Sequence, residues 1–153
     1  RQRPDVDPDR VLVIGQSFGG ASTVALAAMN PPGVQAAINF AGGSGGDPKG
    51  RPQNPCSQAA LDRTYAQYGA QARVPMLWIY TENDMFFGPQ LPRQWHATFT
   101  QAGARPALCS SRRMGKTGIP SSRVFRRSGS QRCQSFWTPT GSRRQAVPEA
   151  LSH

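Results

Sequence analysis

Three short apolar segments alternate with three segments of helical composition, and this alternation constrains the fold more than any other feature. The segment 11–14 (VLVI) is β-branched and uninterrupted, which predicts a strand buried on both faces. The order strand, helix, strand, helix, strand, helix indicates a mostly parallel α/β sheet with crossover helices. The predicted strands are 11–14, 34–40 and 74–80, and the predicted helices are 18–30, 57–68 and 91–102, with Ser57 as a cap and Gly69 and Gly103 as stops.

Three strands are too few for a stable domain of this type. The chain begins without Met inside a polar stretch, RQRPDVDPDR. We therefore expect the first strands of the domain to lie upstream. The sequence contains no apolar run of about 18 residues, so no membrane span is expected. No signal peptide is visible within this sequence. The protein could be cytoplasmic or, if a signal peptide lies upstream, periplasmic or secreted.

The net charge of +10 is concentrated in the last third of the chain. Residues 1–105 hold nine Lys or Arg and seven Asp or Glu, whereas residues 106–153 hold nine Lys or Arg and only Glu149. From residue 109 onward there is no helical or strand period and few aliphatic side chains. These differences predict a partial α/β domain over 1–105 and a basic, poorly ordered tail over 106–153.

The three cysteines suggest neither a disulfide framework nor a metal site. Cys56, Cys109 and Cys133 are few and scattered, and no C-x-x-C pair is present. We expect no metal and no organic cofactor.

The stretch GQSFGG follows the first predicted strand and opens the first predicted helix. A Gly15-x-Ser17-x-Gly19 pattern in this context is the nucleophile elbow, where a tight, strained turn exposes a serine above the sheet edge. Small residues at Gly15 and Gly19 would let strand and helix approach, and the Phe18 amide would face an oxyanion at the helix N-terminus. The alternative is an ordinary glycine-rich turn. We interpret Ser17 as a nucleophile.

A carboxylate follows the third predicted strand, as a serine–acid–histidine order requires. Asp84 lies just past that strand, at the same predicted sheet edge as Ser17. Glu82 is a rival that lies nearer the strand end, and Asp84 could instead only cap a turn. Its position favours Asp84 as the acid that orients a histidine.

Residues 1–105 resemble the α/β-hydrolases of the dienelactone hydrolase group. The match is carried by VDPDRVLVIGQSFGG, AAINFAGGSGG and, most specifically, VPMLWIYTENDMFFGPQLPRQWHATFTQAGA. The resemblance implies the C-terminal portion of an α/β-hydrolase fold, with Ser17 as nucleophile and Asp84 as acid. It implies hydrolysis of a small-molecule carboxylic ester or lactone through an acyl-enzyme. It also implies that the first strands and a second oxyanion donor lie upstream.

The histidine that the resemblance requires, usually in a DGH string after the next strand, is missing. His96 falls within the last predicted helix, where a packing role is expected, and His153 is the last residue, beyond the tail. Our hypothesis for the missing histidine is that the tail is translated out of frame. In the shifted frame, each codon consists of the third base of one codon and the first two bases of the next. In that frame the stretch SSRRMGKTGIPSS can encode PPYGKDGHSLF, which contains DGH. Residues 128–142 can encode WEPAVPEFLDAHGF, which has helical apolar spacing. A genuine basic tail is the alternative.

Two other functions stay open. The basic tail could bind nucleic acid or anionic surfaces non-specifically, but its few aromatic residues show no regular spacing. The chain could also be a non-catalytic fragment that exposes apolar strand faces and aggregates. The substrate is not defined: Phe86, Phe87 and Trp95 could line an apolar acyl pocket, or they could simply pack in the core.

Overall fold

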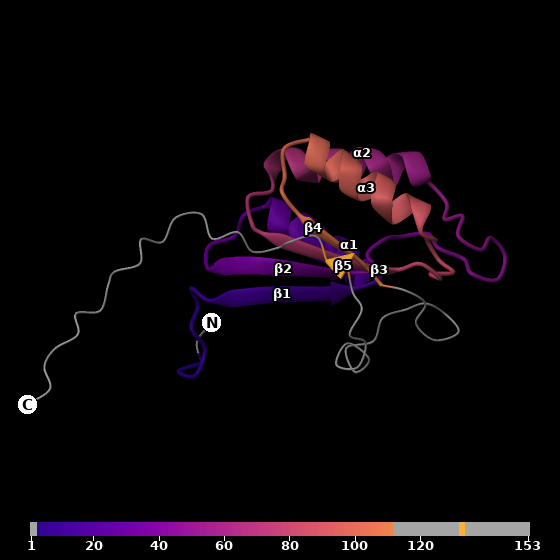
Figure 1. Ribbon diagram of the computed structural model, residues 1–153. Helices are drawn as coiled ribbons and strands as arrows, with labels where there is room; N and C mark the ends of the chain where they lie inside the picture. Colours follow the sequence, from indigo (N-terminus) through magenta and orange to yellow (C-terminus); the bar gives the residue numbers. More distant parts are fainter. Residues whose placement is uncertain (1–2, 112–131, 134–153) are drawn as a thin grey trace, which may run out of the picture.

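The computed structural model describes residues 3–111 and 132–133; for 109–111 and 132–133 only the backbone is described. Its centre is a five-stranded sheet in the order β1-β2-β3-β4-β5 (Figure 1). The strands are β1 (Val11–Gln16), β2 (Val34–Phe40), β3 (Met76–Thr81), β4 (Ala107–Ser111) and β5 (Arg132–Cys133). The helices are α1 (Phe18–Ala28), α2 (Gln58–Gln71) and α3 (Gln90–Gln101).

The first four strands are parallel and neighbour one another in chain order, and β5 pairs antiparallel with β4. Because parallel crossovers are right-handed, a sheet built in chain order places all its helices on one face. Figure 1 shows this arrangement, with α2 and α3 side by side over the sheet. The predicted α/β fold with crossover helices is confirmed.

The sheet continues past the change in composition at residue 105. Strand β4 pairs with β3 from Leu77 opposite Ala107 to Thr81 opposite Ser111. The sequence predicts only three strands, because the side chains of this segment carry no clear strand pattern. Ladder hydrogen bonds use backbone groups alone, so the open edge of β3 can accept a segment of weak propensity. Apart from Arg132–Cys133 in β5, the predicted tail after residue 111 lies outside the described residues.

An aromatic cluster forms the core between the sheet and the two outer helices. The Trp78 ring on β3 lies 5.3 Å from that of Tyr65 on α2 and 5.1 Å from that of Phe99 on α3. All three residues are at most 1% exposed. Gly69 does not end α2, as the sequence predicted, but lies inside it, buried against the backbone of Phe99. A glycine that looks like a stop signal thus serves helix–helix contact.

The face of the sheet opposite the helices leaves apolar side chains accessible on β1. Leu12 is 52% and Ile14 is 56% exposed. The prediction of a strand buried on both faces is therefore wrong for this structure. The physical reason is position: β1 is the edge strand, and the helices cover only the other face.

Candidate active site

Ser17 occupies a sharp turn between β1 and α1. Its backbone angles, φ 56° and ψ −126°, are ones that side-chain-bearing residues rarely adopt. The turn is held by the Ser17 N–H, which donates to the Phe40 carbonyl at 2.9 Å, and by the Ser17 carbonyl, which accepts from Gly20 and Ala21. Ser17 is exposed. The strained strand-to-helix turn that the sequence predicts is present.

Of the two glycines in the predicted motif around Ser17, only Gly15 is needed for close contact between strand and helix. A Cβ at Gly15 would collide with the Gly19 carbonyl and with Thr23, so strand and helix touch there. A Cβ at Gly19 would meet no atom of the described residues within 4 Å, its own helix backbone aside, so the prediction that Gly19 must be small for close approach is wrong. That role belongs to Gly20, which is buried against Asn39 and Gly42.

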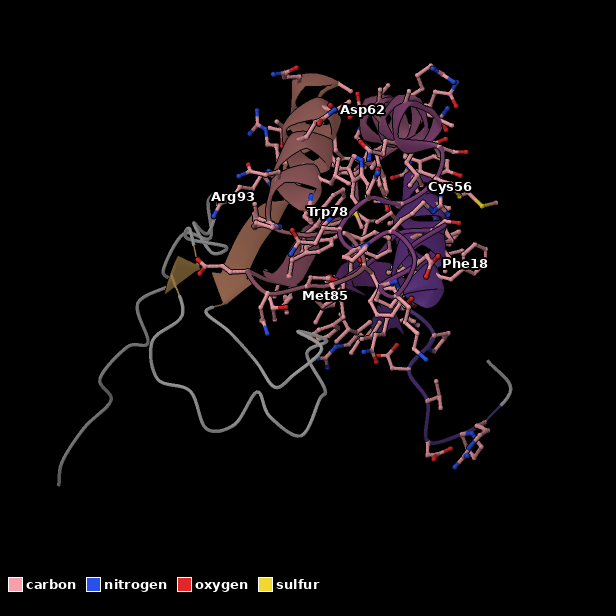
Figure 2. The ribbon with its side chains drawn as sticks, turned by 90° about the vertical axis from the view of Figure 1, so that its right-hand side faces the viewer. Phe18, Cys56, Asp62, Trp78, Met85 and Arg93 are labelled. Carbon is pink, nitrogen blue, oxygen red and sulfur yellow. The ribbon has the colours of Figure 1, made fainter. Side chains whose placement is uncertain are left out.

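The N-terminus of α1 begins directly after Ser17. The first N–H groups of a helix have no intrahelical acceptor and carry partial positive charge, which suits a developing oxyanion. The Phe18 N–H is the first of them. The Phe18 side chain lies at the outer surface of α1 (Figure 2) and is 70% exposed.

A buried hydrogen-bond network supports the loop that follows β2. The Gly42 carbonyl accepts from the Tyr80 hydroxyl at 2.7 Å and from the Tyr65 hydroxyl at 3.2 Å. The Tyr80 hydroxyl accepts in turn from the Asn39 amide at 3.2 Å. One residue on, the Gly43 N–H donates to the Ser17 carbonyl at 3.3 Å. The loop is thereby tied to both the core and the serine turn.

Asp84 lies just after β3, and its two carboxylate oxygens are in different surroundings. Its Oδ1 accepts from the backbone N–H of Phe86 at 2.7 Å and of Phe87 at 3.2 Å. Its Oδ2 is buried and has no hydrogen-bond partner among the described residues, which is costly for a carboxylate. Burial raises the pKa of Asp84, and the two backbone donors partly offset that effect. Its rival Glu82 is exposed.

Ser17 and Asp84 share the carboxyl edge of the sheet, on strands separated by β2. The loop after β2 links them. Gly43 donates to Ser17 on one side and packs against the Phe87 ring on the other, while the Phe87 N–H donates to Asp84. The serine turn and the Asp84 carboxylate are therefore connected through one loop at one edge of the sheet.

His96 packs as the sequence predicts. Its Nε2 lies 3.2 Å from the carbonyl of Pro106, and its ring contacts Trp78 edge-on with 5.8 Å between centroids. Pro106 precedes β4, at the end of the sheet opposite to Asp84. Burial lowers the pKa of His96. His153 lies outside the described residues, and so does the stretch SSRRMGKTGIPSS from residue 112 onward, whose codons are proposed to encode a DGH string.

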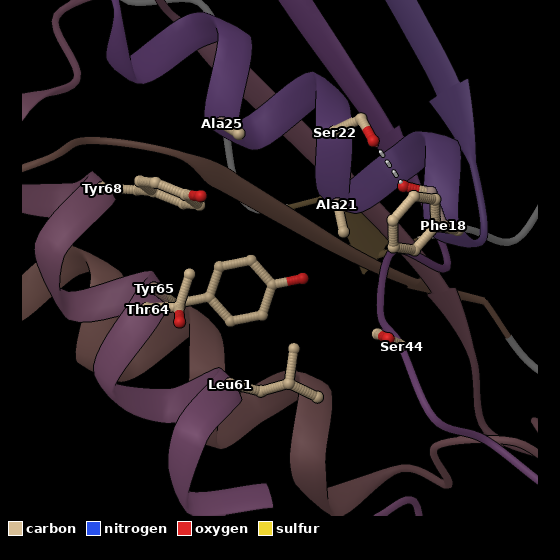
Figure 3. A pocket seen from close by; sticks show the side chains of 9 residues that line it. All are labelled: Phe18, Ala21, Ser22, Ala25, Ser44, Leu61, Thr64, Tyr65 and Tyr68. Atoms are coloured by element: carbon tan, nitrogen blue, oxygen red, sulfur yellow. Dashed lines mark hydrogen bonds between the residues drawn. The ribbon is translucent and has the colours of Figure 1, made fainter. Parts of the chain in front are cut away.

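The predicted acyl-pocket residues turn out to be mainly core. Trp95 is fully buried and contacts Phe87 edge-on, with 5.5 Å between ring centroids, and Phe87 is itself 4% exposed. A pocket of about 200 Å³ lies elsewhere, between α1 and α2 (Figure 3). The signal for it was the run of small residues along α1, which the sequence analysis did not use.

The described residues contain no group of three His, Cys, Asp or Glu side chains placed to hold a metal ion. Within the same part of the chain, none of the helices is long and apolar enough to cross a membrane. Cys56 is exposed and free.

Comparison with protein families decides the identity. The model of the dienelactone hydrolase family matches residues 1–109. The chain belongs to the dienelactone hydrolase family. The match covers the serine turn, Asp84 and the start of β4. No curated protein matches the chain.

Solved structures show the same fold as this dienelactone hydrolase family member. A Klebsiella pneumoniae protein assigned as a dienelactone hydrolase is 19% identical, with a TM-score of 0.51 over 74% of this chain and 42% of that one. Arabidopsis thaliana SOBER1 is 18% identical, with a TM-score of 0.53 over 80% and 51%. A puromycin-hydrolyzing peptidase from Mycobacterium tuberculosis is 18% identical, with a TM-score of 0.51 over 74% and 20%. The chain thus spans about half or less of each.

Proposed function

We propose that this chain carries the nucleophile and the acid of a serine hydrolase that cleaves small carboxylic esters or lactones. The observation that carries the proposal is the pairing of two features at one sheet edge. Ser17 lies in a strained turn at a helix N-terminus, and one oxygen of the buried Asp84 carboxylate has no hydrogen-bond partner within the described part of the chain. Membership of the dienelactone hydrolase family supports hydrolase chemistry.

In the proposed reaction the Ser17 Oγ attacks the ester carbonyl carbon, and the Phe18 N–H stabilises the resulting oxyanion. A histidine takes the serine proton and returns it to the leaving alcohol, and Asp84 orients that imidazole through its free Oδ2. Water then cleaves the acyl-enzyme by the reverse sequence of proton transfers.

The chain as printed lacks that histidine at the expected place, so we propose that it has little or no activity. The family match ends at residue 109, close to where the charge composition changes, and this coincidence supports out-of-frame translation of the tail. On this proposal the codons of residues 116–119, translated in the correct frame, encode the DGH sequence of the parent protein. The alternative of a tail that binds anionic surfaces rests on residues outside those described.

Two measurements test the proposal. Resequencing the coding DNA through codons 105–109 should find a missing or extra base. Expressed in the corrected frame with its upstream sequence, the protein should hydrolyse para-nitrophenyl acetate, and Ser17→Ala and Asp84→Asn should each lower kcat by about 10³-fold or more. Hydrolysis by the corrected protein that persisted in Ser17→Ala would rule out this nucleophile. Ser17-dependent hydrolysis by the printed chain would overturn its proposed inactivity.

A further inference from the structure

The pocket between α1 and α2 has a volume of about 200 Å³ and is formed by two facing helical stripes (Figure 3). On each helix the lining residues recur three or four positions apart, so they share one face. Small side chains on α1 leave the space that larger ones on α2 border. The lining residues are Phe18, Ala21, Ser22, Ala25, Ser44, Leu61, Thr64, Tyr65 and Tyr68.

The pocket lies beside the serine turn. Phe18, at one end, directly follows Ser17 in the chain. Ser44, at the same end of the pocket (Figure 3), directly follows Gly43, whose N–H donates to the Ser17 carbonyl. A group seated in the pocket would therefore be bounded by the two segments that flank Ser17.

The lining favours an uncharged, apolar group. It contains no ionisable carboxylate, amine or guanidinium. The hydroxyls of Ser22 and Thr64 already donate to carbonyls of their own helices, at 3.0 Å to Phe18 and 2.8 Å to Ala60. Three aromatic rings border the space, which is partly open to solvent. Its volume of about 200 Å³ is larger than the roughly 150 Å³ of an enclosed apolar cavity that holds benzene.

The inner wall of the pocket is held rigidly. Tyr65 is 1% exposed, and its hydroxyl donates to the Gly42 carbonyl at 3.2 Å. Its ring packs 5.3 Å from that of Trp78 and 5.5 Å from that of Trp95. A wall fixed before binding lowers the entropy cost of taking up a ligand.

We infer that the α1–α2 pocket binds a phenyl-sized, uncharged apolar substituent of the substrate, so that the esters accepted are aryl-bearing and neutral. This inference rests on the proposed function for its link to catalysis. The binding itself does not need the serine or a histidine. It can therefore be measured on the chain as it stands.

The test is binding of para-fluoroacetophenone, an uncharged aryl ketone that cannot be hydrolysed, followed by fluorine NMR. We expect saturable binding with a dissociation constant on the order of 1 mM, because the ligand is small. Ala25→Leu fills the pocket and should weaken binding about tenfold or more. Ala97→Leu, the same change at an exposed position of α3, should leave binding unchanged.

Tyr68→Ala is a second variant, which removes one aromatic wall and should also weaken binding. Circular dichroism confirms that each variant is folded. Equal binding by the parent chain, Ala25→Leu and Tyr68→Ala, or the absence of saturable binding, overturns the inference. Ser17→Ala should bind the probe with the same affinity as the parent chain. If the corrected protein fails to hydrolyse esters but the pocket still binds the probe, the proposed chemistry is refuted and the inferred ligand class of the pocket is retained.

Discussion

The hydroxyl of Tyr80 donates a hydrogen bond to the backbone carbonyl of Gly42 at 2.7 Å. Tyr80 is on β3 and Gly42 is in the loop after β2, one residue before the amide that reaches the Ser17 carbonyl. The bond therefore connects the centre of the sheet to the backbone that braces the serine turn. Its donor is 3% exposed, so water cannot readily replace it.

Tyr80→Phe should destabilise the protein by about 1–3 kcal/mol, because it leaves the buried Asn39 amide without its acceptor and weakens the hold on Gly42. Urea denaturation measures the change. Tyr68→Phe is the matched control, since its hydroxyl makes no hydrogen bond to a described residue. An equal effect of the two substitutions would show that the network contributes nothing particular.

Gly15→Ala and Gly19→Ala should have opposite effects although both glycines belong to one motif. The first places a methyl group against the Gly19 carbonyl and Thr23 and should cost about 1–3 kcal/mol. The second meets open space in a helix and should stabilise by up to about 1 kcal/mol. Chemical denaturation of both variants compares them directly. A loss of stability in Gly19→Ala would contradict the open space described around Gly19.

Ser17→Gly should be more stable than Ser17→Ala by about 1–3 kcal/mol, because glycine adopts the positive φ of this turn without strain and alanine does not. Both variants lack the hydroxyl, so the comparison isolates the backbone. Thermal unfolding of the pair measures it. Equal melting temperatures would indicate that the turn holds no strain.

The raised pKa of Asp84 predicts a pH dependence of stability. Because the folded pKa lies above the ordinary value of 3.8, the folded protein binds more protons between those two values. The free energy of unfolding should therefore fall as pH rises through that window. Asp84→Asn should lose this component, seen as the difference between urea titrations of the two proteins from about pH 3 to pH 7. The lowered pKa of His96 acts with opposite sign, but it contributes equally to both proteins.

The exposed apolar side chains on β1 should promote self-association of this chain. Edge strands with exposed apolar residues are prone to pair with other chains. The double variant Leu12→Lys, Ile14→Lys should raise the monomer fraction in sedimentation experiments. Gln67→Lys, Gln94→Lys adds the same charge at exposed helical positions and is the control. If the control helps equally, net charge and not the β1 surface governs association.

Much of the fold and the candidate site follows from the sequence because the signals are local. The apolar runs around Val13, Ile38 and Trp78 and the helical segments between them predict a parallel sheet. The Gly15–Ser17 turn and Asp84 lie at strand ends, so the sheet edge that they share follows from strand direction alone. Periodicity could not reveal β4, because its pairing depends on the free edge of β3 and not on its own side chains.

The sequence by itself determined the α/β class, the strained turn at Ser17 and the position of Asp84 after a strand, since each depends on residues close together in the chain. Only the tertiary structure decided which glycine is sterically required, that Gly69 serves a helix contact, and that Trp95 is core. The tertiary structure also placed the pocket between α1 and α2, and it gives Asp84 Oδ2 no hydrogen-bond partner among residues 3–111 and 132–133. These properties arise from distances between residues far apart in sequence, which local patterns do not encode.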